Sequence, residues 1–245
     1  MLEAFTDTTP RGDAIDFANV YVDIEGRTPV DEARMIILCT HYDTKRLPFH
    51  FVGANDAGSG TAVLLELARI LAESAGERPV TYRLLFLDGE EAVYDWNEGQ
   101  DNTYGSRYHV AQLQEDPDLL KRVAACVLLD MVGDAKLQLY TESQSDSQLL
   151  NIIFEVARRN QLGRYVGGPR RHINDDHVPF LEARIPAVNL IDFGYGPRSS
   201  STSGGAWWHT EEDTLDKLSP DSLHVVGRIV LWSLPELETW ALNQP

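Results

Sequence analysis

Short apolar runs alternate along the chain with segments in which apolar residues recur at helical spacing. The runs that we expect to form strands cover residues 16–24, 35–40, 80–87, 123–129, 137–140 and 186–191. The segments that we expect to form helices cover residues 61–74, 106–113 and 147–160, with an added turn at 118–121 and a last helix from Ser219 onward. This alternation predicts a three-layer α/β/α fold around a central mixed, mostly parallel, twisted sheet.

The strand patterns differ in how much burial they predict. Residues 35–40 and 123–129 are almost continuously apolar, which is typical of strands covered on both faces. Residues 16–24 alternate only loosely, and we expect them to form an edge strand. A chain of 245 residues with 43% hydrophobic content is expected to fold as a single domain, residues 1–245.

Acids and imidazoles stand where the expected strands end. Glu90 and Glu91 follow the run 80–87, His41 follows 35–40, and Asp130 follows 123–129. The carboxyl ends of parallel strands meet at one edge of a sheet, where binding sites form. Two neighbouring carboxylates beside a core repel each other unless a cation or a proton offsets their charge. The pattern therefore predicts a metal site at this edge.

The net charge of −17 narrows the classes of partner. Nucleic acids and anionic membrane surfaces attract basic proteins, so neither is expected to bind. No apolar run is long enough to span a membrane. Cys39 and Cys126 lie inside apolar runs and are expected to be buried free thiols, which leaves the compartment open. The N-terminus lacks a signal-peptide pattern, and we expect the natural chain to begin earlier.

Zinc prefers histidine nitrogen and carboxylate oxygen, and a catalytic zinc keeps one coordination position open. The candidate ligands are spread along the chain: His41, Asp56, Glu91, Asp130 and His209. Asp43 has the spacing to accept a hydrogen bond from the second ring nitrogen of His41. The glycines around Asp56 lack the lysine of a phosphate-binding loop, and we expect them to let the backbone fold tightly.

Several motifs together resemble the M28 zinc-peptidase superfamily, and more closely its glutaminyl cyclase branch. They are residues 53–60 (Gly-Ala-Asn-Asp-Ala-Gly-Ser-Gly), 88–91 (Asp-Gly-Glu-Glu) and 208–210 (Trp-His-Thr). The cyclase branch is favoured by residues 41–45 (His-Tyr-Asp-Thr-Lys), by Trp96, by the long loop after Glu91, and by residues 175–180 (Asp-Asp-His-Val-Pro-Phe). The resemblance runs from about residue 16 to 225 and implies the zinc-exopeptidase fold, with the first helices missing here.

The resemblance implies an enzyme that cyclises N-terminal glutamine of peptides or proteins to pyroglutamate and releases ammonia. One Zn²⁺ would be held by Asp56, Glu91 and His209, and the Asp56–Ala57 peptide bond would be cis. His41 and Asp130 match ligands of a second metal in the aminopeptidases. A monomer and a secreted or extracytoplasmic location are expected on the same ground.

The same resemblance assigns the residues around the metal. Glu90 would transfer the proton, and Asp130 and Asp175 would join it in a hydrogen-bond network. Trp96 and Trp208 would line the substrate pocket and exclude water. For these tryptophans, ordinary core packing is the alternative.

Some features depart from the cyclase pattern. Residues 53–60 read more like the aminopeptidases, Asn189 replaces a histidine of animal cyclases, and residues 194–206 look like an insertion beside the pocket. The insertion leaves open which of Phe193, Tyr195 and Trp207 contacts substrate. The alternative function is a di-zinc aminopeptidase that hydrolyses N-terminal residues from peptides, in which Glu90 would deprotonate a water.

Overall fold

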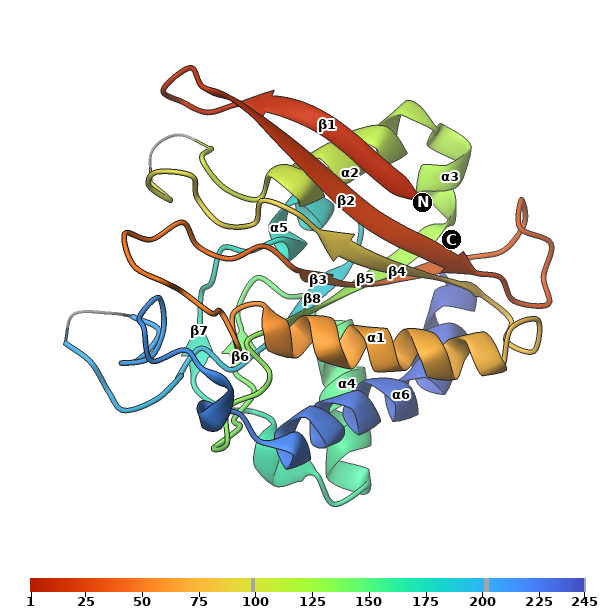
Figure 1. Ribbon diagram of the computed structural model, residues 1–245. Helices are drawn as coiled ribbons and strands as arrows, with labels where there is room; N and C mark the ends of the chain where they lie inside the picture. Colours follow the sequence, from red (N-terminus) through yellow and green to blue (C-terminus); the bar gives the residue numbers. More distant parts are fainter. Residues whose placement is uncertain (98–99, 201–202, 245) are drawn as a thin grey trace.

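The computed structural model describes residues 1–97, 100–200 and 203–244 (Figure 1). Its central sheet has six strands in the order β1-β2-β4-β3-β5-β8. The strands are β1 (Leu2–Thr8), β2 (Ala14–Ile24), β3 (Met35–His41), β4 (Thr81–Leu87), β5 (Val123–Asp130) and β8 (Ala187–Ile191). The β1–β2 and β2–β4 pairs are antiparallel and the other three pairs are parallel, which confirms the expected mixed, mostly parallel sheet.

Helices cover both faces of the sheet, which confirms the three-layer arrangement (Figure 1). One face carries α1 (Gly58–Glu73), α4 (Ser147–Arg159) and α6 (Pro220–Leu242). The other carries α2 (Tyr104–Glu115), α3 (Pro117–Arg122) and α5 (His177–Glu182). None of the helices in the described residues is long and apolar enough to cross a membrane.

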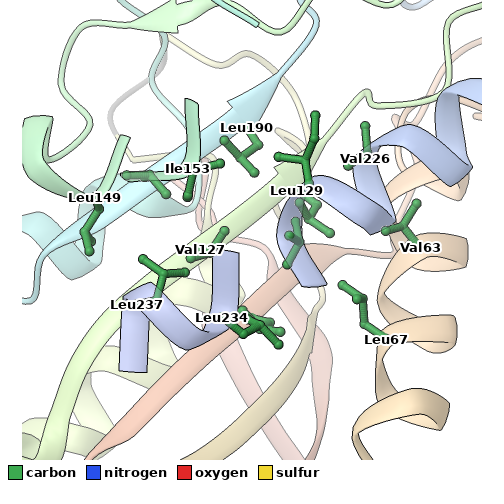
Figure 2. Packing of buried hydrophobic residues seen from close by; sticks show 14 of the residues in the cluster. Val63, Leu67, Val127, Leu129, Leu149, Ile153, Leu190, Val226, Leu234 and Leu237 are labelled. Carbon is green, nitrogen blue, oxygen red and sulfur yellow. The ribbon is translucent and has the colours of Figure 1, made fainter. Parts of the chain in front are cut away.

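The larger core lies between the sheet and helices α1, α4 and α6 (Figure 2). Val63 and Leu67 of α1, Val127 of β5 and Leu234 of α6 are all at most 4% exposed. The small residue Gly60 lets α1 approach the sheet, because a Cβ there would stand 2.6 Å from the carbonyl oxygen of Leu129. This packing fixes the start of α1, and with it the loop before the helix.

Shortening Ile153, a fully buried residue of α4, is expected to cost about 1 kcal/mol of unfolding free energy, since Ile→Val leaves a methyl-sized void. Ile152 is only partly buried, so the same change there provides the matched control and should cost less than half as much. Urea denaturation of Ile153→Val and Ile152→Val measures both. Equal losses would contradict the assignment of Ile153 to the core.

The edge of the sheet differs from the expectation. β1 covers residues 14–24 on their outer side, so the segment expected as an edge strand is an inner strand. The alternation of β1 is inverted: Glu3 and Phe5 point inward while Leu2 is exposed. Glu3 contacts Nδ1 of His109 at 2.9 Å, and Phe5 stacks on Tyr108. A strand whose inward-facing residues include a charged one does not show the usual alternation of buried apolar and exposed polar residues.

Three short elements also differ from the expectation. Residues 137–140 form no strand, because their buried N–H groups bond irregularly, as that of Leu139 does to the carbonyl of Tyr165 at 2.8 Å. A small second sheet instead pairs β6 (Thr141–Glu142) with β7 (Arg170–Arg171). Helix α5 was not expected. Cys39 and Cys126 are buried free thiols as predicted, with their sulfur atoms 3.4 Å apart.

Candidate active site

The acids predicted from the strand ends lie together. β4, β3 and β5 are neighbours in the sheet and run parallel, so their carboxyl ends meet at one edge. His41 closes β3, Asp130 closes β5, and Glu90 and Glu91 follow β4. All four side chains are buried.

Asp56, Glu91 and His209 form the first candidate metal cluster. Nε2 of His209 lies 2.8 Å from Oε1 of Glu91 and 3.2 Å from Oδ2 of Asp56. The three ligand atoms lie within 4.8 Å of one another. One imidazole and two carboxylates form a donor set that suits a catalytic zinc, so these residues fit a metal ion.

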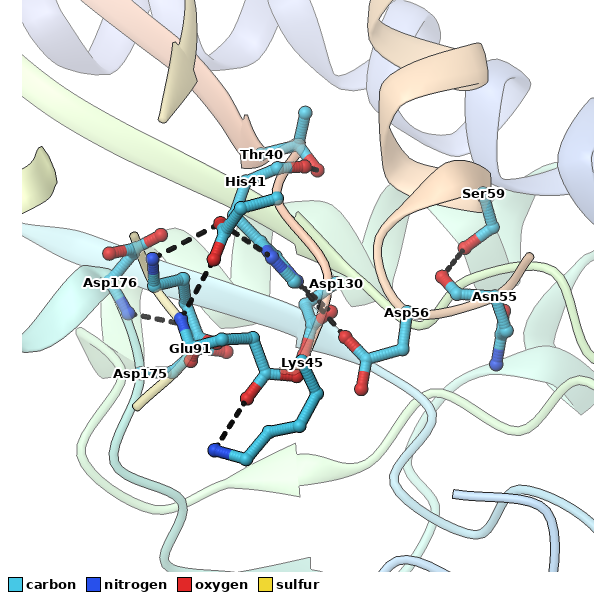
Figure 3. Close-up of polar contacts among 12 residues, drawn as sticks. Thr40, His41, Lys45, Asn55, Asp56, Ser59, Glu91, Asp130, Asp175 and Asp176 are labelled. Atoms are coloured by element: carbon cyan, nitrogen blue, oxygen red, sulfur yellow. Dashed lines mark hydrogen bonds and ion pairs between the residues drawn. The ribbon is translucent and has the colours of Figure 1, made fainter. Parts of the chain in front are cut away.

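A second cluster shares Asp56 (Figure 3). Nε2 of His41 lies 3.2 Å from Oδ1 of Asp56 and 3.2 Å from Oδ1 of Asp130. These atoms again lie within 4.8 Å of one another. The two oxygens of Asp56 therefore face two different imidazoles.

The loop that carries Asp56 is held by a residue that the sequence did not single out, Asp213. Its carboxylate accepts hydrogen bonds from the backbone N–H of Asn55 at 2.8 Å and of Asp56 at 3.2 Å. The hydroxyl of Tyr195 donates to it at 2.8 Å. Gly53 turns the loop with φ +61°, and a Cβ there would stand 2.4 Å from the carbonyl oxygen of Asp56. The predicted tight fold around Asp56 is present, and the Asp56–Ala57 peptide bond is cis as expected.

We expect Asp213→Asn to weaken metal binding about 10–100-fold, the usual cost of losing a group that orients a ligand. An amide has one acceptor oxygen, so it cannot serve both backbone N–H groups and the tyrosine hydroxyl as the carboxylate does. Competition with a chelator measures the affinity. Asp216→Asn, at an exposed acid in the same region, is the control. Equal affinity in both variants would contradict this role.

Asp43 has two sets of contacts. Its oxygens accept hydrogen bonds from the backbone N–H groups of Glu90 and Glu91, each at 3.1 Å. Its distance to Nδ1 of His41 is 3.4 Å, an ion-pair contact without hydrogen-bond geometry. Asp43 therefore fixes the turn after β4, and its predicted role in orienting His41 stays a prediction.

Burial raises the pKa of the Glu90 carboxyl well above its usual value, opposed by His41 and reinforced by Asp175 and Glu91. Burial and the nearby charge of Asp130 raise the pKa of Asp175 to about 7. Asp175 accepts a hydrogen bond from Nδ2 of Asn189 at 2.6 Å. In the described part of the chain, no hydrogen bond joins Glu90, Asp130 and Asp175 to one another, so the predicted network is a group of electrostatically interacting acids.

The acids hold protons on the imidazoles. Burial lowers the pKa of His209, but hydrogen bonds to Asp56 and Glu91 outweigh this effect and raise it to about 9. His41 behaves in the same way beside Asp130. An imidazole must lose this proton to ligate a metal. A bound cation would then replace the positive charge with which the protonated imidazoles offset the surrounding carboxylates.

Lys45 is a second residue that sequence reasoning missed as a site residue. Its ammonium lies 3.3 Å from Oε2 of Glu91 and donates to the carbonyl oxygen of Ala92 at 3.0 Å (Figure 3). This contact occupies one oxygen of Glu91 and leaves Oε1 facing His209.

The buried glutamate Glu142 anchors the segment that leads to Asp175. Its carboxylate accepts hydrogen bonds from the N–H of Ser145 at 2.6 Å and of Ile173 at 3.2 Å. Nε2 of His177 lies 3.2 Å away, so this histidine helps to hold the Glu142 carboxylate in place. Burial would raise the pKa of Glu142, but these partners hold it near 2.

A cleft of about 1120 Å³ opens above the clusters. Trp96 and Trp208 line it, and Trp208 stacks on His209 with ring centroids 4.0 Å apart. Of the aromatics beside the loop 194–206, Phe193 lines the cleft, whereas Tyr195 is buried against Asp213. Residues 201 and 202 of that loop lie outside the described residues.

The sequence of this chain is similar to those of known proteins. Residues 19–233 match peptidase family M28. Glutaminyl-peptide cyclotransferase-like proteins of Bos taurus and Mus musculus are 31% and 33% identical over 96% of this chain. The chain spans 64% of the length of each of them.

The crystal structure of a glutaminyl cyclase from an Acidobacteriales bacterium superposes with a TM-score of 0.90 at 34% identity, covering 98% of this chain and 79% of that one. The glutaminyl cyclase of Porphyromonas gingivalis gives a TM-score of 0.77 at 26% identity, covering 96% of this chain and 83% of that one. The chain therefore belongs to peptidase family M28, in its glutaminyl cyclase branch.

Proposed function

We propose that the protein converts the N-terminal glutamine of peptides to pyroglutamate and releases ammonia. The observation that carries this proposal is the position of Glu90, buried beside the cluster of Asp56, Glu91 and His209 at the base of a cleft walled by Trp96 and Trp208. The similarity to a glutaminyl-peptide cyclotransferase-like protein and to a glutaminyl cyclase supports the same reaction.

Asp56, Glu91 and His209 would hold one Zn²⁺. When bound, this ion supplies a Lewis acid that polarises the side-chain carbonyl of the substrate glutamine. The nucleophile is the α-amine of the substrate itself, so the chain need supply no serine or cysteine.

Glu90 would accept a proton from the α-amine and deliver it to the departing ammonia. Burial raises the pKa of the Glu90 carboxyl, which favours its holding the proton between the two steps. Asp130 and Asp175 lie close enough to raise the pKa of neighbouring carboxyls, and we propose that they tune Glu90.

Trp96 and Trp208 would keep water from the side-chain amide, which would otherwise be hydrolysed to glutamate. Their large apolar surfaces also hold the amine and the amide of one residue close together, which favours closure of the five-membered ring.

The di-zinc aminopeptidase remains the second candidate, because the cluster of His41, Asp56 and Asp130 could hold another ion. Metal analysis of the purified protein separates the two: one ion per chain supports the cyclase and two support the aminopeptidase. A monomeric state and an extracytoplasmic location stay predictions.

Mass spectrometry of a glutamine-initiated peptide after incubation tests the reaction directly. Ring closure through the internal amine removes ammonia, a loss of about 17 Da. Hydrolysis of the side chain would instead add about 1 Da, because water replaces ammonia. Release of free glutamine would identify the aminopeptidase.

A further inference from the structure

The charge of the side chains that line the cleft changes from negative at its base to positive at its rim. The base carries the carboxyl groups of the two clusters together with Glu90 and Asp175. The outer wall carries Arg171 at the end of β7, His172 directly after it, and Arg198 in the loop after Phe193. A basic rim is unexpected in a protein whose net charge is −17.

The backbone at Arg171 is firmly held. β7 pairs in parallel with β6, placing Arg171 opposite Glu142, and the carbonyl of Arg171 accepts a hydrogen bond from Ser143 at 2.8 Å. Two residues on, the N–H of Ile173 donates to the buried carboxylate of Glu142. The guanidinium of Arg171 therefore projects from a fixed wall.

Arg171 and Arg198 line the cleft together with Tyr140, and the charges of both arginines act on the Tyr140 hydroxyl. Burial and Asp192 raise the pKa of the Tyr140 phenol, while the charges of Arg171 and Arg198 oppose that rise. Both guanidinium groups thus lie within electrostatic reach of one hydroxyl, although they are 27 positions apart in the chain (198 − 171).

Arg171 and Arg198 have no acidic ion-pair partner among the residues that the structure describes. Lys45, deeper in the cleft, by contrast pairs with Glu91. Within the described part of the chain, Asp95 also lines the cleft, and its side chain accepts a hydrogen bond from the N–H of Asn97 at 2.9 Å. Among the described residues, the outer wall therefore carries positive charge without a paired acid.

We propose that this wall is a subsite for an acidic side chain, and that the enzyme prefers peptides with aspartate or glutamate at the second or third residue. This inference rests on the proposed function, which places the α-amine at Glu90. An extended peptide advances about 3.3 Å per residue, so its next side chains leave the base and pass the wall. Without local cations, the acidic protein would repel such a substrate.

Competition between matched peptides tests the subsite. The peptides Gln-Glu-Glu-Ala-amide and Gln-Lys-Lys-Ala-amide carry opposite side-chain charges at the second and third residues, and Gln-Ala-Ala-Ala-amide reports turnover of a neutral substrate. Ion pairs at exposed sites contribute about two- to fivefold each, so kcat/KM should favour the acidic peptide over the basic one by about 10-fold at low salt. The ratio should fall as salt screens the charges.

The double variant Arg171→Gln, Arg198→Gln should lower the ratio of kcat/KM for the acidic over the basic peptide to one or below, because the remaining net charge of the protein repels the acidic peptide. Arg170→Gln is the matched control, because Arg170 is the other residue of β7 and does not line the cleft; its ratio should equal that of the wild type. Each ratio is measured in one preparation, so partial loss of folded protein cancels.

The outcomes separate the two proposals. If none of the peptides is cyclised, the proposed function is wrong. If the neutral peptide is cyclised but the wild-type ratio is near one, the acidic subsite is wrong. A ratio that survives the double variant also overturns it.

Discussion

Turnover of a glutamine-initiated peptide is expected to fall about 10²–10⁴-fold when Glu90 is replaced by glutamine, the usual contribution of a positioned acid–base group. The amide keeps the shape of the carboxyl group but cannot accept a proton from the α-amine. Glu90 lies outside the ligand cluster of Asp56, Glu91 and His209, so the variant should keep its metal.

Three measurements on Glu90→Gln make this expectation specific: kcat with a glutamine-initiated peptide, metal content, and the thermal midpoint of unfolding. Glu211→Gln changes an exposed acid two residues after His209 and serves as the matched control, with kcat near the wild-type value. If Glu90→Gln retained full turnover with its metal bound, proton transfer by Glu90 would be wrong.

Removing the imidazole of His209 is expected to lower metal affinity by more than about 100-fold. Groups that merely orient a ligand contribute about 10–100-fold, so loss of a ligand should exceed that range. His209 also holds Asp56 and Glu91 at 3.2 Å and 2.8 Å, and without it these carboxylates would repel each other in a buried site. Chelator competition and metal analysis of His209→Ala measure the effect.

His41→Gln provides the contrast. His41 belongs only to the second cluster, so under the one-zinc proposal this variant keeps its metal while His209→Ala loses it. Because His41 is buried, circular dichroism must show that His41→Gln is folded before its metal content is compared. Loss of one of two ions in His41→Gln would instead favour the aminopeptidase.

The part of the site that could be predicted from the sequence pattern consists of the acids and the histidine at the ends of strands. A continuous apolar run followed by His41, by Glu90 and Glu91, or by Asp130 indicates a parallel strand and a ligand at its carboxyl end at once. Parallel pairing then brings these residues together without further information. His209 and Asp56 lie in loops, and they were recognised through family motifs.

What the sequence could not show depends on contacts between distant segments. Asp213 stands among other acids of a polar loop, and nothing in its neighbourhood signals that it holds the backbone of Asp56. Lys45 and Glu91 are 46 positions apart (91 − 45) and meet only because β3 and β4 are adjacent. β1 was missed because Glu3 points inward, and the partner that compensates it, His109, lies on a distant helix.

The carboxylate of Glu142 has a consequence for how substrates enter. It binds its own turn at Ser145, the cleft wall at Ile173 and the start of α5 at His177. Swinging that wall outward would strip a buried charge of several partners at once, which is costly. On this side the entrance of the cleft is therefore rigid. A peptide is selected by whether its side chains fit a fixed rim, and the product can leave without a movement of the wall.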